Sequence, residues 1–133
     1  MLRTLALALV LGAAAVVPAA GAADQTGFEL GRRGGNIRPF TVVIAVSGKV
    51  RATGPVKIRK TRVARLELGR LNRLAVTVGF ERLSAATSCP GTLPDVAATF
   101  IRVGRETVRV HGTCVAGYQR LWKALAHAAR LSY

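Results

Sequence analysis

The chain has 133 residues, of which 20 are Lys or Arg and only 6 are Asp or Glu, so its formal net charge is +14. Beyond an apolar stretch at the start, residues 24–133 remain, which suffice for one modest hydrophobic core and exclude a second domain. The charge excess predicts a salt-dependent attraction to anionic polymers and membranes. Because the basic residues are scattered from Arg32 to Arg130, charge alone does not separate a solvated cationic surface from a dedicated binding face.

Residues 1–23 have the layout of a cleaved secretory signal peptide, with Arg3 followed by an uncharged run that ends in small residues. Cleavage after Ala22 and cleavage after Ala23 both satisfy the small-residue rule. The alternative is an uncleaved membrane anchor, because the run is nearly long enough to span a bilayer. Pro18 and the lack of cations directly after the run favour cleavage. We therefore predict a protein that is secreted or held in the cell envelope, and that meets the membrane only through this segment before cleavage.

The first half of the mature chain predicts four strands. Residues 28–32 alternate apolar and polar side chains, as in a short strand, which we expect at a sheet edge. Residues 40–46 are apolar on both faces, as in a strand in the middle of a sheet. A Ser-Gly turn then leads into residues 49–53 and completes a hairpin. Residues 56–62 alternate again and predict a fourth strand.

The second half predicts two helices and a hairpin. Apolar residues at spacings of three and four predict an amphipathic helix over 65–78, and Gly79 fits a left-handed C-terminal cap. Residues 96–103 and 107–111 alternate and are joined by a turn, so they predict a hairpin. A second amphipathic helix follows over 118–131, with its cations on the polar side.

These elements predict one α+β domain over residues 24–133. We expect a two-layer sandwich in which an antiparallel sheet of about five to six strands carries both helices on one face. The expected order of elements is β-β-β-β-α-β-β-α.

The chain has two cysteines, Cys89 and Cys114, and in an exported protein they are expected to form a disulfide. Only one pairing is possible. Closing a loop of about 25 residues stabilises a fold by about 3 to 4 kcal/mol if the unfolded-chain entropy model holds. The bond would close the domain by fixing the loop before the hairpin to the start of the second helix.

The segment from Cys89 to Asp95 reads Cys-Pro-Gly-Thr-Leu-Pro-Asp. Together with residues 40–48, 66–80 and 107–114 and the spaced leucines of the last helix, it resembles a group of small exported proteins from GC-rich bacteria. The pattern Cys-Pro-Gly-x-Leu-Pro-Asp is the most specific part of this resemblance. The group has no assigned activity, so the resemblance supports the fold and the disulfide and implies no catalytic residues.

No motif places a catalytic nucleophile, so we predict neither catalytic residues nor a cofactor, and no enzyme activity. A hydrolytic triad would have to use Ser88, Asp95 and His111, whose spacing does not predict that they converge. A metal site is not predicted either, because the two histidines belong to different predicted elements and the cysteines are committed to each other.

The preferred functional hypothesis is a binding module for anionic cell-envelope or extracellular material. Five arginines follow the fourth predicted strand and the polar side of the first helix, and guanidinium forks suit phosphate and carboxylate. These candidate residues are Arg59, Arg62, Arg65, Arg70 and Arg73. The chain has seven aromatic residues and no RNA-binding signature, which argues against nucleic acid as the partner.

The alternative is a protein-interaction or inhibitor-like domain that presents the loop from Ser84 to Asp95 to another exported protein. Two prolines and the disulfide would rigidify this loop, which lowers the entropy lost on binding. The candidate contact residues are Pro90, Gly91, Leu93, Pro94 and Asp95.

Overall fold

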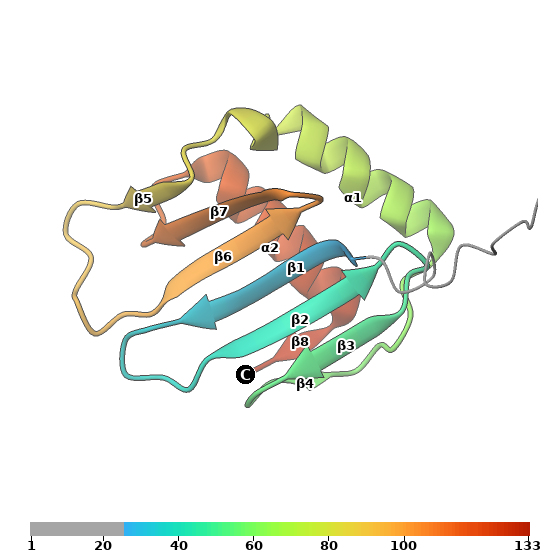
Figure 1. Cartoon of the computed structure of the whole chain (residues 1–133), viewed down its shortest axis with the longest axis horizontal. Helices are drawn as coiled ribbons and strands as arrows, with labels where there is room; N and C mark the ends of the chain where they lie inside the picture. Colours follow the sequence, from blue (N-terminus) through green and yellow to red (C-terminus); the bar gives the residue numbers. More distant parts are fainter. Residues whose placement is uncertain (1–25) are drawn as a thin grey trace, which may run out of the picture.

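The computed structural model describes residues 26–133, so the predicted signal peptide lies outside the described residues. The described chain forms two layers. One is a six-stranded sheet, and the other consists of two helices that lie behind the sheet in Figure 1, on the same face. This arrangement confirms the predicted α+β sandwich.

Eight strands, two α-helices and one short 3₁₀-helix make up the described chain. In chain order they are β1 (Thr26–Arg33), β2 (Phe40–Ala45), β3 (Val50–Thr53), β4 (Lys57–Ile58), α1 (Arg65–Thr77), η2 (Phe80–Arg82), β5 (Ala86–Ser88), β6 (Ala98–Val103), β7 (Glu106–His111), α2 (Ala116–Ala129) and β8 (Leu131–Ser132). The main sheet has the order β3-β2-β1-β6-β7-β5, and β4 pairs with β8 in a second, two-stranded sheet.

β1 lies in the middle of the main sheet, so the expectation of an edge strand is wrong. It pairs antiparallel with β2 on one side and with β6 on the other. Phe28 and Leu30 of β1 are buried against the helical layer. The alternation of side chains correctly predicts which residues are buried, but it carries no information about how many strands flank the segment.

The predicted fourth strand over 56–62 is reduced to the two residues of β4. Beyond β4 the chain turns back to β3, where Val50 N donates a hydrogen bond to Thr61 O (2.9 Å) and Val63 N donates one to Gly48 O (2.8 Å). The segment therefore divides its backbone hydrogen bonds between β8 and the start of β3, and this division ends the strand early.

The predicted polar loop over 84–95 contains β5, which pairs with β7 in parallel. The main sheet is therefore mixed rather than purely antiparallel. Three residues are too few to show a period of two in the sequence, so the strand is defined by its neighbour. Cys89 N extends the pairing by donating a hydrogen bond to His111 O (2.8 Å).

The core lies between the sheet and the helices, and α2 contributes most of the helical share. α1 buries two residues, whereas α2 buries six and begins and ends two residues before the predicted helix. Gly79 follows α1 with φ of 67°, as its predicted role as a left-handed cap requires. The most completely buried side chains are Phe28, Leu30, Val42, Ile44, Val63, Ile101, Val110, Tyr118, Leu121 and Leu125.

Candidate functional site

One face of the main sheet is turned away from both helices. In Figure 1 it faces the viewer, and no described helix covers it. Because side chains alternate along a strand, the residues between the core residues project from this side, which we call the open face. On β1, β6 and β7 these residues are Glu29, Gly31, Arg33, Ala98, Phe100, Arg102, Thr107, Arg109 and His111.

Strand register places one arginine on each side of β6. Phe100 of β6 is paired with Gly31 of β1 and, on its other side, with Arg109 of β7. Two residues back along β6, Ala98 is paired with Arg33 of β1. Arg33 and Arg109 therefore flank a floor that Ala98 and Phe100 provide.

The Phe100 ring lies over its partner on β1, Gly31, because glycine has no side chain to keep the ring away. A Cβ atom at Gly31 would lie 2.7 Å from Cε1 and 2.9 Å from Cζ of Phe100, so the ring occupies the space that a side chain would need. The Arg33 guanidinium covers the ring at 4.4 Å from its centroid, a cation–π contact. Phe100 is consequently only 6% exposed although it lies on the open face.

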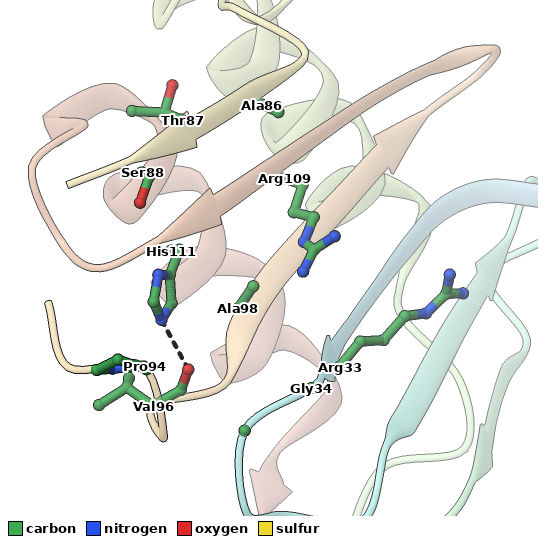
Figure 2. Close-up of a pocket in the computed structure, with 11 residues that line it drawn as sticks. Arg33, Gly34, Ala86, Thr87, Ser88, Pro94, Val96, Ala98, Arg109 and His111 are labelled. Carbon is green, nitrogen blue, oxygen red and sulfur yellow. Dashed lines mark hydrogen bonds between the residues drawn. The ribbon is translucent and has the colours of Figure 1, made fainter.

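A cavity of about 420 Å³ lies at one end of the open face, and we call it the end pocket. Its walls come from the turn after β1, from β5, from the chain before β6 and from β7 (Figure 2). Two arginines, Arg33 and Arg109, and one histidine, His111, line it, and no Asp or Glu side chain is among its lining residues. In Figure 2 the Arg109 side chain extends over β6. The end pocket is therefore cationic.

His111 is held in place by both its ring and its backbone. The ring nitrogen Nε2 lies 2.8 Å from the carbonyl oxygen of Val96, and because a carbonyl only accepts, Nε2 is the donor (Figure 2). Nδ1 is then the ring nitrogen that faces a ligand; it accepts a hydrogen bond in the neutral ring and donates one when the ring carries both protons. Ser88 of β5 is the register partner of His111, which brings a hydroxyl group to the same end of the pocket.

A second cavity, of about 270 Å³, continues along the open face, and we call it the sheet pocket. It shares Arg33, Ala98 and Arg109 with the end pocket and adds Glu29 and Arg102. Arg102 Nη1 lies 3.6 Å from Glu29 Oε2, so this carboxylate offsets the charge of Arg102. The two cavities together form a groove, and its central residues are the shared ones.

The five arginines predicted from the sequence as the anion site lie elsewhere. All are exposed, but none of them lines the end pocket or the sheet pocket. Two lie between β4 and α1, and three lie on α1: they are Arg59 and Arg62, and Arg65, Arg70 and Arg73 respectively. The structure thus brings a different set of arginines together around a cavity.

The predicted interaction loop is exposed and anchored. Its candidate contact residues Pro90, Gly91, Leu93, Pro94 and Asp95 all face solvent, with Leu93 64% exposed. Asn36 N, in the turn after β1, donates a hydrogen bond to Asp95 O (3.1 Å). Pro94 also lines the end pocket, so the loop and the groove adjoin.

The predicted disulfide between Cys89 and Cys114 is confirmed, with the two Cα atoms 5.7 Å apart. Cys89 follows β5 directly, and Cys114 lies between β7 and α2. The bond therefore fixes β5, one wall of the end pocket, to the segment that enters α2.

Ser88, Asp95 and His111 do not assemble into a triad. Nε2 of His111 is bonded to the Val96 carbonyl, and no hydrogen bond within residues 26–133 joins the ring to Ser88 or Asp95. Within the same residues, no group of three or more His, Cys, Asp or Glu side chains is arranged to hold a metal ion.

The four basic residues of the groove are not among the site residues predicted from the sequence: Arg33, Arg102, Arg109 and His111. The alternation of Thr107 to His111 does indicate that Arg109 and His111 point away from the core. The missing information is the pairing of β1 with β6, which brings Arg33 beside them and creates the groove.

The chain matches no protein-family model, no curated protein and no solved structure. In the part of the chain that the structure describes, no helix has the length and apolar character needed to cross a membrane. The groove is therefore interpreted from its own residues.

Proposed function

We propose that this protein is an exported, non-enzymatic binding module that holds anionic groups of cell-envelope or extracellular polymers in the open-face groove. The end pocket carries the proposal, because arginine and histidine side chains line it and no carboxylate does. This hypothesis keeps the ligand class predicted from the sequence and moves the binding site from the arginines of α1 to the open face.

The electrostatics of the groove support an anionic ligand. Arg102 has Glu29 as a counter-charge, whereas neither Arg33 nor Arg109 has a carboxylate partner among the described residues. A planar guanidinium presents a fork of donors that matches phosphate or carboxylate oxygens. A hydrogen bond to a charged group contributes about 1.5 to 3 kcal/mol.

Export is part of the proposal and rests on two observations. The N-terminal segment, residues 1–23, has the pattern of a signal peptide. The Cys89–Cys114 disulfide is the kind of bond that persists in oxidising compartments outside the cytoplasm. Both favour a partner that the protein meets outside the cytoplasm, such as an envelope polymer.

The proposal is tested by comparing two double variants that lose the same charge. Arg33→Gln with Arg109→Gln removes the groove cations, and Arg70→Gln with Arg73→Gln removes two cations from α1. We expect the groove variant to elute from an immobilised polyanion at clearly lower salt than the α1 variant, which should elute close to the wild type. If the two variants elute together, retention depends on net charge alone and the groove is not the site.

A second candidate function is an interaction domain that presents the Ser84–Asp95 loop to another exported protein. The observation that favours it is Leu93, a large apolar side chain that is 64% exposed on a loop anchored by the disulfide. Two more apolar residues, Ile37 and Val96, are exposed on the neighbouring segments. An anchored apolar surface of this kind loses little entropy when it binds.

The two candidates respond to different substitutions. Leu93→Ser should abolish binding to a protein partner and leave polyanion binding unchanged. Arg109→Gln should weaken polyanion binding and leave binding to a protein partner unchanged. A panel of exported hydrolases can be assayed for inhibition or complex formation at micromolar protein. Absence of any interaction across the panel would remove the second candidate.

A further inference from the structure

The groove has two compartments separated by an apolar step. The end pocket lies at the level of His111 and Arg109 on β7, and the sheet pocket at the level of Arg109 and Thr107. Two residues along a strand span about 7 Å, so the compartments are offset by about that distance. The apolar residue that lines both compartments is Ala98, and the Phe100 ring adjoins it in the sheet pocket beneath the Arg33 guanidinium.

The polar groups of the end pocket come from different directions. Arg109 and His111 project from β7, and Ser88 projects from the neighbouring β5 (Figure 2). A planar carboxylate presents two oxygens in one plane, whereas a tetrahedral phosphate presents oxygens toward several walls at once. The guanidinium fork, the hydroxyl group and, in the imidazolium form of His111, the Nδ1–H group therefore suit a phosphate better than a carboxylate.

The sheet pocket offers a second cationic position. In Figure 2 the Arg33 guanidinium points away from the end pocket, and it lies on the Phe100 ring, which lines the sheet pocket. Arg102 lines the same cavity, with its charge offset by Glu29. A second anionic group can therefore bind beside Arg33, one compartment away from the first.

We propose that the ligand of the groove is an extended phosphodiester polymer whose neighbouring phosphates are joined by a short carbon linker. One phosphate occupies the end pocket at Arg109, His111 and Ser88. The linker crosses the apolar floor at Ala98, and the next phosphate lies in the sheet pocket at Arg33, whose guanidinium covers the Phe100 ring. A polyphosphate, in which the phosphates are joined without carbon atoms, fits less well because it would place charged oxygens on this apolar floor. The inference rests on the proposed function and specifies the polymer.

Oligomers with one to four glycerol phosphodiester units, capped by glycerol at both ends, test this inference by calorimetric titration, with oligoglutamates of equal charge as the comparison. We expect the two-unit oligomer to bind about 10-fold or more tightly than the single unit, because the second contact becomes intramolecular. Further units should add little. Oligoglutamates should bind about 10-fold more weakly than glycerol phosphate oligomers of the same charge, since each loses a charge-assisted hydrogen bond.

Two single substitutions separate the compartments. Arg109→Gln should weaken oligomers of every length by about 10-fold or more. Glu29→Gln removes the carboxylate of the sheet pocket, so it should tighten the two-unit oligomer by about 2- to 5-fold and leave the single unit unchanged. A gain in affinity cannot arise from loss of the fold. Arg120→Gln on α2 removes one positive charge away from the groove and serves as the control.

The outcomes distinguish the inference from the proposed function. If oligoglutamates bind as tightly as glycerol phosphate oligomers and still depend on Arg109, the phosphodiester inference is wrong and the anion-binding function stands. The inference is equally wrong if one unit binds as tightly as two, or if Glu29→Gln affects both equally. If no oligomer distinguishes Arg109→Gln from Arg120→Gln, the proposed function fails together with the inference.

Discussion

Replacing Gly31 by alanine tests whether the floor of the groove is as rigid as its packing indicates. A methyl group here would contact the carbonyl oxygen of Phe40 on β2, and it would lie 2.7 Å and 2.9 Å from two ring atoms of Phe100. The ring can move only by leaving the floor, and the carbonyl can move only with its strand. Overpacking of this kind costs about 1 to 3 kcal/mol. We expect a value of about 2 to 3 kcal/mol, because a backbone atom is among the contacts.

Urea and thermal unfolding, both monitored by circular dichroism, measure this loss of stability. In a domain of this size 1 kcal/mol corresponds to about 4 to 8 °C in Tm, so the Gly31→Ala variant should melt about 10 °C or more below the wild type. Gly69→Ala is the matched control: its Cβ would approach only Arg73 Nη1, at 3.5 Å, in the interior of α1. That variant should gain about 0.5 to 1 kcal/mol. A Gly31→Ala variant that is as stable as the wild type would refute the rigid floor.

Two further predictions concern stability. Burial raises the pKa of Tyr118 to about 12, against a smaller lowering by its hydrogen bond to Thr99, so the unfolded chain ionises this group first. The buried, neutral Tyr118 therefore stabilises the fold fully below pH 10. This contribution, about 2 to 3 kcal/mol, is lost as the pH rises from 10 to about 12. Urea titrations across this pH range should show a smaller loss of stability in Tyr118→Phe. Replacing Cys89 and Cys114 together by serine should lower the free energy of unfolding by about 3 to 4 kcal/mol, measured by the same method, and should weaken binding in the end pocket. An equal loss of stability between pH 10 and about 12 in Tyr118→Phe, or an unchanged urea midpoint in the double serine variant, would contradict the corresponding explanation.

The sequence predicts the helices and strands themselves better than it predicts which strands lie side by side. Alternation in residues 107–111 identifies the buried side chains of β7, and the spacing of apolar residues identifies α1 almost to its ends. Both signals come from side chains that repeat within one element. The position of β1 between β2 and β6 depends on pairing with a strand about 70 residues later, for which a single sequence has no local signal.

The short strands cannot be predicted from the sequence pattern either. β5 has three residues and β8 has two, so neither can display a period. β5 is held by parallel pairing with β7 and by the disulfide that follows it. The two candidate sites differ for this reason: five arginines close together in the sequence form a visible pattern, whereas the groove arginines come from three strands.

A groove on a sheet surface requires that side chain length changes sharply between neighbouring strands. On the open face this change occurs at Ala98, which is paired with Arg33 and lines both cavities together with Arg109. Its small side chain leaves space above the backbone, and the arginines form the walls of that space. Phe100 does not fill the space, because its ring lies flat on Gly31. A glycine at position 31 is therefore a condition for the cavity and not only for stability, so a larger residue there should reduce both the stability of the sheet and the depth at which an anion can bind.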